Sequence, residues 1–190
     1  GTDKRIGGRF LRAGPAYGGS CFPKDTRAIL NTANEIKSDL SLIKSVIKSN
    51  ENRSTILIQR IFKILNGKLK NKKICLLGVT FKANTDDMRE SSSLKIIPAL
   101  SRKGALITYY DPTGEKKEFN KIKNVQFKPS IKTACENSDL IIIHTEWNDF
   151  KSINFKNFSK GKKFIIYDMR NIYDPTKIKN QGFKYFSVGR

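Results

Sequence analysis

The chain has 190 residues, and 38% of them are hydrophobic, enough for the core of one large or two small domains. Its apolar runs are far shorter than the ~20 residues that span a bilayer, which argues against a transmembrane helix. A net charge of +20 suits nucleic acid or an anionic membrane, but the lysines are scattered singly or in pairs, which favours a solvated surface over either partner.

The chain holds three cysteines, Cys21, Cys75 and Cys135, which are widely spaced and form no CxxC pair. This pattern indicates neither a disulfide framework nor a zinc site, and we expect no metal. Free thiols suit a reducing compartment, so we expect a cytoplasmic protein. The opening "GTDKRIGGRF" reads as the interior of a sequence, and we expect this chain to be part of a longer protein.

Residues 26–66 carry helical signals almost throughout. Thr26 is the expected cap of a first helix, and apolar residues recur at three- and four-residue steps from Leu42 to Leu65. The pattern predicts one long amphipathic helix or two in tandem. Gly67 is the expected stop.

From residue 72 the pattern changes to short apolar runs, "KICLLGV", "ALITYYD", "DLIIIHT" and "KFIIYDM". Each run predicts a strand that is buried on both faces. Helical stretches separate them, and one of these is expected to begin at Ser91 or Ser92 and to end at Gly104. The sequence therefore predicts an α/β fold: a helical region, residues 1–70, followed by a Rossmann-like parallel sheet, residues 71–190.

The first of these strands ends in "LLGVTFKANTDD", where a dinucleotide-binding fold would place GxGxxG. Only Gly78 is present, so a pyrophosphate could not approach the backbone closely, and we predict no NAD site there by itself. Lys82, Arg89 and the helix start near Ser91 could hold a phosphate instead. A solvated loop with two basic residues is an equal alternative.

The stretch "GPAYGGSCFPKD" joins flexible glycines to a cysteine. Lys24 and the start of a helix near Asp25 favour the thiolate form of Cys21, which predicts a nucleophile. Asp25 is the local candidate for moving protons or orienting water. His144 is expected to make structural hydrogen bonds at a strand end, and Cys75 and Cys135 to be small buried hydrophobes.

The motifs "GGSCFPKD", "LLGVTFKANTDDMRESSS", "YYDP", "HTEW" and "YDMRN" occur in this order. Together they resemble the UDP-glucose/GDP-mannose dehydrogenase family, and within it the UDP-glucose 6-dehydrogenases. The resemblance implies a central helical dimerisation region that carries the cysteine loop, and a C-terminal domain that binds UDP-glucose. It also implies an N-terminal NAD-binding domain that is not in this chain.

The resemblance implies that NAD oxidises UDP-glucose to UDP-glucuronate in two hydride transfers, through a thiohemiacetal and a thioester on Cys21, with Asp25 assisting water. It also implies cofactor contacts at Lys24 and Arg89. Arg5 would enter the substrate site of a neighbouring subunit in a homodimer or larger oligomer. The remaining implied substrate contacts are Phe10, Leu11, Arg12, Tyr17, Gly18, Phe22, Phe81, Lys82 and Arg170.

Two alternatives remain at this stage. Within the family, a GDP-mannose or other nucleotide-sugar 6-dehydrogenase has a similar cysteine loop. Outside enzymes, the chain could be a non-catalytic module that binds a sugar nucleotide or assembles a complex. The chain by itself is expected to be inactive, because the NAD domain and the family's upstream catalytic lysine and asparagine are absent from it.

Overall fold

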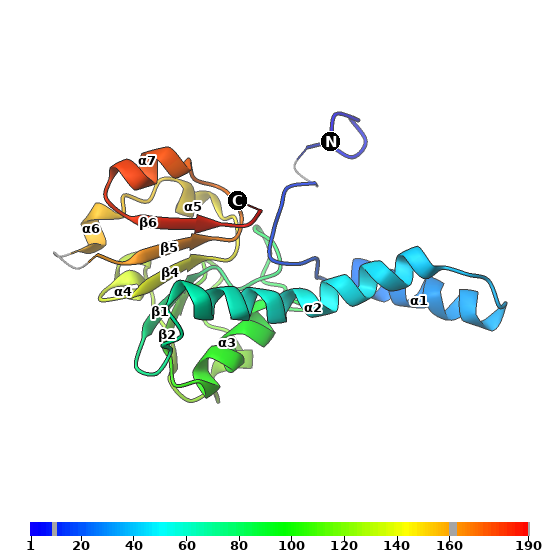
Figure 1. Cartoon of the computed structure of the whole chain (residues 1–190), viewed down its shortest axis with the longest axis horizontal. Coiled ribbons are helices and arrows are strands. Elements are labelled where there is room, and N and C mark those ends of the chain that lie inside the picture. Colours follow the sequence, from blue (N-terminus) through cyan, green and yellow to red (C-terminus); the bar gives the residue numbers. More distant parts are fainter. Residues whose placement is uncertain (9–10, 160–162, 190) are drawn as a thin grey trace.

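The computed structural model describes residues 1–8, 11–159 and 163–189. It consists of an α/β domain and a two-helix hairpin that projects from it, with the N-terminal segment leading to the hairpin (Figure 1). The helical elements are α1 (Phe22–Glu35), α2 (Ser41–Ile64), α3 (Ser93–Arg102), η1 (Lys117–Phe119), α4 (Ile131–Cys135), α5 (Asn148–Lys151), α6 (Lys156–Ser159) and α7 (Pro175–Asn180). The strands are β1 (Lys73–Leu77), β2 (Leu106–Tyr110), β3 (Val125–Phe127), β4 (Leu140–Ile143), β5 (Ile165–Asp168) and β6 (Lys184–Ser187).

The strands form one parallel sheet in the order β3-β2-β1-β4-β5-β6. This is the doubly wound order of a Rossmann fold, so the predicted α/β class is confirmed. The four predicted strands are confirmed as β1, β2, β4 and β5. The sequence analysis missed β3 and β6, which are the two edge strands and are short, with three and four residues.

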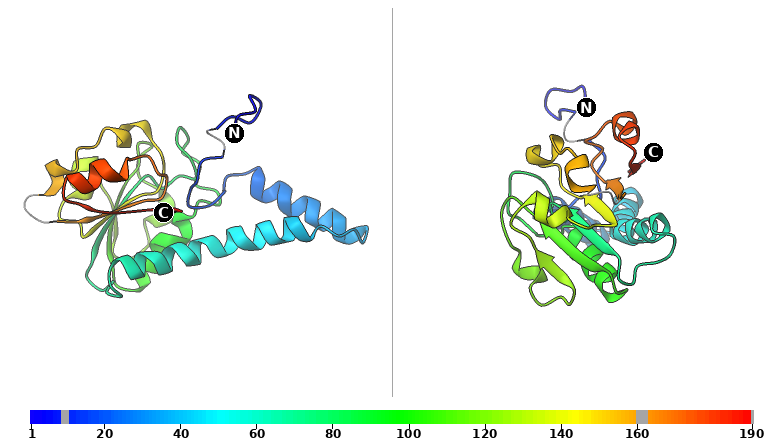
Figure 2. Two further views of the ribbon diagram at one scale, coloured as in Figure 1. Left: turned by 45° about the horizontal axis from the view of Figure 1, so that its top comes forward. Right: turned by 90° about the vertical axis from the view of Figure 1, so that its left-hand side faces the viewer.

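Helices cover both faces of the sheet (Figure 2). Ile74 and Leu76 of β1 point into a core that also contains residues of α2 and α3. Cys75 and Leu77 point into the opposite core, which includes Ala134 of α4. Because alternate side chains of one strand are buried on opposite faces, the central strands are continuous apolar runs.

The predicted helical stretch is two helices that fold back on each other. The prediction that Thr26 caps the first helix is wrong: α1 begins at Phe22, and the Thr26 hydroxyl donates to the Phe22 carbonyl at 2.8 Å from inside the helix. Pro23 explains the earlier start, because proline is favoured in a first helical turn. The helix ends before Lys37, whose φ of 56° is left-handed.

The long helix α2 belongs to both parts of the molecule. Its buried residues all lie in its C-terminal half, at Ser54, Leu57, Ile61 and Ile64, where it packs on the sheet, while its N-terminal half pairs with α1 (Figure 1). The expected stop is confirmed, since Gly67 has a φ of +74° and its N–H donates to the Phe62 carbonyl at 2.9 Å. Within the described ranges, no helix combines the length and the apolar character that a membrane span needs.

Candidate active site

A cavity of about 890 Å³ lies where the cysteine loop meets α2 and the loop between β1 and α3. Phe81 and Lys82 follow β1, and Arg170 follows β5, so the cavity opens at the carboxyl ends of the strands. Ligands of open α/β sheets bind at this edge. A second cavity, of about 610 Å³, is lined by Lys73 and Leu106 at the opposite edge. We therefore take the first cavity as the candidate site.

Eight of the residues implied as site residues line this cavity: Arg12, Tyr17, Gly18, Cys21, Phe22, Phe81, Lys82 and Arg170. They come from four separate places in the sequence, and the fold brings them together. The structure does not place five other implied residues in its lining: Arg5, Leu11, Lys24, Asp25 and Arg89. Phe10 lies outside the described residues.

Cys21 stands at the N-cap of α1 and is exposed. Its Sγ lies 3.7 Å from the Ser20 hydroxyl oxygen, and the rings of Tyr17 and Phe22 lie beside each other with centroids 5.7 Å apart. Asp25 is one turn further along α1, and its N–H donates to the Cys21 carbonyl at 2.8 Å. The thiol is therefore open to the cavity and fixed at the start of a helix.

The carboxylate of Asp25 pairs with Lys24 Nζ at 3.3 Å, and both side chains are well exposed, at 65% and 74%. An ion pair this exposed holds its partners only weakly. Asp25 is therefore available to solvent, one helical turn from Cys21.

The cysteine loop rests on the β1–α3 loop, and its glycines allow this contact. The Gly19 N–H donates to the Arg89 carbonyl at 2.8 Å. A Cβ on Gly18 would lie 2.5 Å from the Glu90 carbonyl oxygen, and one on Gly19, whose φ is +82°, would lie 2.8 Å from the Phe81 ring. Any larger residue would separate the two loops.

Arg170 is the most firmly held cation of the cavity. Its Nε donates to the His144 carbonyl at 2.8 Å and lies 3.1 Å from the Glu146 carboxylate, while its Nη2 donates to the Phe81 carbonyl at 2.8 Å. Burial lowers the pKa of Arg170, and Glu146 opposes that shift. These contacts tie the ends of β4 and β5 to the β1–α3 loop.

The cavity is strongly positive. Arg12, Arg53, Lys82 and Arg170 line it, and Asp87 is the only acid among the described lining residues. The hydrogen bonds from Arg89 hold the pKa of Asp87 below its usual range, so this carboxylate is already neutralised by a neighbour. Several cations around a cavity with apolar walls suit a ligand that carries phosphate and a planar ring.

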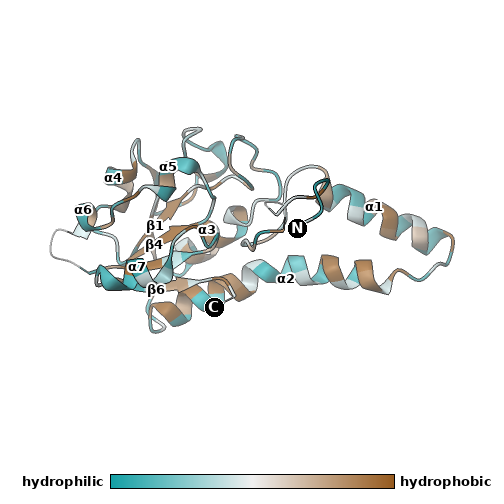
Figure 3. Cartoon of the chain, turned by 90° about the horizontal axis from the view of Figure 1, so that it is seen from above, coloured by the Kyte–Doolittle hydropathy of each residue, from teal (hydrophilic) through white to brown (hydrophobic). Residues whose placement is uncertain are grey.

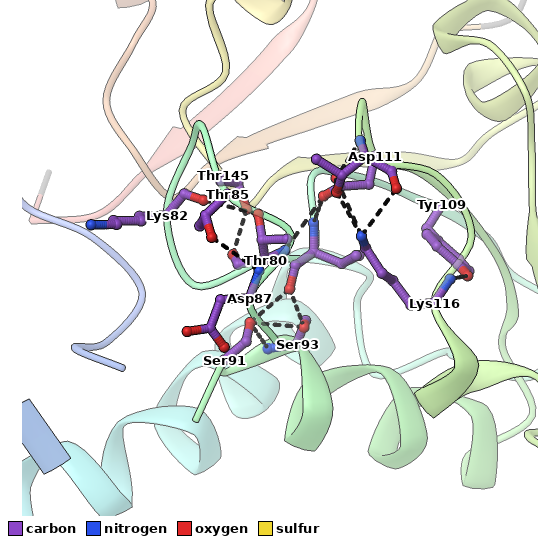
Figure 4. A network of polar contacts seen from close by, with 12 residues as sticks. Thr80, Lys82, Thr85, Asp87, Ser91, Ser93, Tyr109, Asp111, Lys116 and Thr145 are labelled. Carbon is purple, nitrogen blue, oxygen red and sulfur yellow. Dashed lines mark hydrogen bonds and ion pairs between the residues drawn. The ribbon is translucent and has the colours of Figure 1, made fainter. Parts of the chain in front are cut away.

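Asp111 occupies the place that a dinucleotide phosphate takes in an ordinary Rossmann domain. Its buried carboxylate accepts from the N–H groups of Val79 and Thr80, just after β1, at 2.8 and 3.4 Å (Figure 4). Thr113 also donates to it, and Lys116 Nζ lies 4.0 Å away. Because these amides are already bonded, the β1 loop does not fit a nicotinamide dinucleotide, in line with its missing glycines.

His144 is buried outside the cavity. Its Nε2 lies 2.8 Å from the Ser92 hydroxyl oxygen, and its Nδ1 lies 3.1 Å from that of Thr145. Burial, with a smaller contribution from Arg170, lowers the pKa of His144 to about 3. The imidazole is therefore neutral near pH 7, and the predicted structural role is confirmed by its position and contacts.

Cys75 and Cys135 are buried, as predicted, with their Sγ atoms 3.8 Å apart. Burial raises the pKa of the Cys75 thiol, which makes it a poor nucleophile. Within the described part of the chain, no group of three His, Cys, Asp or Glu side chains is arranged to hold a metal ion.

The sequence analysis missed several lining residues on α2, above all Asn50 and Arg53. One signal was present. Val46, Asn50, Arg53 and Leu57 follow one another at steps of four, three and four residues, so two polar side chains interrupt an apolar face of the helix. Polar residues on such a face indicate a partner that binds them.

Comparisons with known proteins agree with this architecture. Residues 75–175 match the UDP-binding domain of the UDP-glucose/GDP-mannose dehydrogenase family, and residues 1–52 match its central domain. A UDP-glucose 6-dehydrogenase of Rickettsia felis is 42% identical over 192 residues, which cover 100% of this chain and 43% of that protein. The chain thus spans less than half the length of this curated relative.

Two solved structures are also similar. A UDP-glucose dehydrogenase from Pyrobaculum islandicum superposes with a TM-score of 0.80 at 28% identity, over 98% of this chain and 41% of that one. A GDP-mannose dehydrogenase from Pseudomonas aeruginosa superposes with a TM-score of 0.71 at 25% identity, over 94% and 41%. The first family match alone covers more than half of the chain, from residue 75 to 175 of 190. The chain therefore belongs to the UDP-glucose/GDP-mannose dehydrogenase family.

Proposed function

We propose that this chain is the central and sugar-nucleotide-binding part of an NAD-dependent UDP-glucose 6-dehydrogenase. The observation that carries the proposal is the single cavity in which exposed Cys21 faces a set of cations, Arg12, Arg53, Lys82 and Arg170. The cations suit a diphosphate, and the thiol lies where a sugar attached to that diphosphate would extend.

In this proposal Cys21 is the nucleophile. Its Sγ adds to the C6 aldehyde carbon of the sugar, the carbonyl oxygen takes up a proton, and the product is a thiohemiacetal. Oxidation of that adduct gives a thioester, which water hydrolyses to the carboxylate of UDP-glucuronate and the free thiol. Asp25, one turn along α1, is the group that we propose for accepting the proton of this water.

NAD would supply the hydride acceptor when bound. The β1 loop of this chain does not fit it, because Asp111 already binds the amides there. We propose that another domain of the whole protein holds NAD, and that Arg89, whose side chain is 69% exposed, reaches it from this side. Lys24 is a second proposed contact. We place the reaction in the cytoplasm, since three free thiols suit a reducing compartment.

We further propose that the hairpin of α1 and α2 forms a homodimer. Large apolar side chains are exposed along it, at Phe22, Ile29, Ile36, Leu42, Val46 and Ile56. Apolar area of this extent on a projecting hairpin suits burial against a second copy. Arg5 is 89% exposed and pairs only with nearby Asp3 in the described contacts, so it is placed to reach a neighbouring subunit.

UDP-glucose is preferred over GDP-mannose as the substrate, and the relatives support this choice. The curated relatives of this chain that carry a substrate name are called UDP-glucose 6-dehydrogenases, at identities near 42%. The GDP-mannose dehydrogenase structure is less similar than the UDP-glucose one, by both identity and TM-score. A non-catalytic binding module stays the alternative of another class.

The proposal is tested by thermal shift with UDP-glucose, UDP, GDP-mannose and NAD, for the wild-type chain and two variants. UDP ligands are expected to raise Tm in proportion to the logarithm of ligand concentration over Kd. Lys82→Ala is expected to weaken UDP binding by roughly tenfold, as loss of a charge-assisted bond does. Lys121→Ala, an equal charge change outside the cavity, is the matched control.

Each result separates the alternatives. A larger shift with GDP-mannose would replace the substrate. UDP binding together with Cys21 alkylation by iodoacetamide no faster than that of buried Cys75 and Cys135 would favour the binding module. No shift with any nucleotide would contradict the assignment of this cavity.

A further inference from the structure

The main chain just before the cysteine loop is held by a single side chain of α2. Tyr17 N–H donates to Asn50 Oδ1 at 3.0 Å, and Asn50 Nδ2 donates to the Tyr17 carbonyl at 3.1 Å. One carboxamide thus binds both polar main-chain groups of one residue, as a neighbouring strand would. Both bonds are partly buried, where hydrogen bonds contribute more than at an open surface.

A second residue of the same helix face adds to this contact. Arg53, three positions after Asn50, donates from Nε to the Pro15 carbonyl at 3.2 Å. Residues three apart on a helix lie side by side, so the two side chains meet consecutive parts of the extended segment 15–17. Of the two, Asn50 is the more selective contact, because only a carboxamide offers both a donor and an acceptor here.

The other side of the segment rests on the α/β domain. The Gly19 N–H donates to the Arg89 carbonyl at 2.8 Å, and Gly18 packs on Glu90. Tyr17 and Gly19 are therefore fixed from opposite directions, and Cys21 follows two residues later at the start of α1. The position of the thiol in the cavity depends on both contacts.

We propose that Asn50 is a positioning residue for Cys21: by binding both main-chain groups of Tyr17, it holds the cysteine loop against the nucleotide-binding loop. Nothing in the amide chemistry requires Asn50 itself to react, since both of its polar atoms are engaged by Tyr17. The inference rests on the proposed function insofar as Cys21 is the nucleophile that needs this position.

The first test is independent of any ligand. Amide hydrogen exchange at Tyr17 is compared in the wild-type chain, in Asn50→Ala and in Asn52→Ala, an exposed asparagine on the same helix. Asn50→Ala is expected to speed exchange by roughly tenfold, which corresponds to the loss of one or two hydrogen bonds. Asn52→Ala should leave it unchanged. Unaltered exchange in Asn50→Ala would overturn the inference.

Asn50→Asp guards against a variant that does not fold. The carboxylate keeps the acceptor for the Tyr17 N–H and loses the donor to the Tyr17 carbonyl. Its exchange rate at Tyr17 is expected to lie between those of the wild type and Asn50→Ala. An exchange rate equal to wild type in this folded variant would count against the paired contact.

The second test separates positioning from stability. UDP-glucose is expected to slow iodoacetamide alkylation of Cys21 in the wild type, and Asn50→Ala to remove most of this protection while the Kd for UDP changes by less than about twofold. A lower Tm with full protection would leave only a structural role and overturn the inference. If UDP-glucose protects no variant, the proposed function fails, and the positioning is judged by Tyr17 exchange together with the Cys21 alkylation rate without ligand, which should rise in Asn50→Ala.

Discussion

Gly78 is the one glycine that this chain keeps where a dinucleotide-binding loop has three. Its φ is +77°, and a Cβ there would lie 2.5 Å from the Cβ of Thr145. Thr145 in turn donates from its hydroxyl to the Thr80 carbonyl at 2.8 Å. The glycine is thus required by the packing of β1 against the residues after β4, and no bound phosphate is needed to explain it.

Gly78→Ala is therefore expected to lower the free energy of unfolding by about 3 kcal/mol or more, through a left-handed φ and a clash with Thr145. Gly114→Ala is the control, since Gly114 also has a positive φ, +88°, but nothing lies within 4 Å. Its effect should be about 1 to 2 kcal/mol, the conformational part alone. Urea unfolding of both variants measures the difference, and equal losses would show that packing is not the cause.

His144 makes the stability of the chain depend on pH. Its pKa is about 3 in the folded state, below the ordinary value of 6.5, so between these values the unfolded state binds one more proton. Stability therefore rises with pH across this window and is lost as pH falls, by up to about 1.4 kcal/mol per unit from this group. His144→Gln should flatten the decline between pH 6.5 and 4 in urea unfolding; an unchanged slope would mean that His144 is charged in the folded protein.

At the scale of elements, the two loops around the cavity form one contact surface. The cysteine loop and the β1–α3 loop meet through glycine backbone, while the exposed ion pair between Arg27 and Glu90, at 3.1 Å, bridges α1 to the same loop. The backbone contact dominates, because exposed pairs contribute at most about 1 kcal/mol. The seating of Cys21 thus depends on the absence of a side chain at Gly18.

Gly18→Ala is expected to push the cysteine loop away from the Glu90 carbonyl, which would lie 2.5 Å from the new Cβ. Protection of Cys21 by UDP-glucose should then fall by roughly tenfold, the equivalent of ~1.4 kcal/mol of lost contact. Gly8→Ala is the matched control, since its nearest neighbour is 3.7 Å away. Alkylation followed by mass spectrometry gives both values, and full protection in Gly18→Ala would refute the loop contact.

At the scale of the whole molecule, the hairpin is the part that lacks a core of its own. Apolar stretches of α1 and α2 lie along the arms that project from the α/β domain (Figure 3). Ile36 and Leu42, near the turn between the helices, are 70% and 75% exposed. The proposed homodimer would cover this surface.

Sedimentation velocity tests the dimer directly. The wild-type chain is expected to sediment as a dimer, and the double variant Ile36→Lys, Leu42→Lys as a monomer, because two charges would be buried in an apolar interface. Leu106→Lys, at an exposed apolar residue of the α/β domain, should stay dimeric. A monomeric wild-type chain at tens of micromolar would contradict an interface on this hairpin.

Much of the architecture follows from local sequence patterns. Apolar runs such as "KICLLGV" and "DLIIIHT" identify the central strands, because a strand that is buried on both faces must be apolar throughout. The edge strands β3 and β6 were missed because they are short and half-exposed, so their residues carry little pattern. Thr26 was misplaced as a cap because helix starts depend on loop geometry as well as on residue type.

The sequence by itself determined the α/β class, the candidate nucleophile Cys21 and the family, since strand periodicity and contiguous motifs are local properties of the chain. Only the tertiary structure decided which side chains share the cavity, because residues as far apart as Arg12, Asn50, Lys82 and Arg170 meet there. It also decided that Asp111 turns inward to bind the amides after β1. The physical reason is that hydrogen bonds and packing between distant segments depend on how the elements dock, and no short stretch of sequence encodes that arrangement.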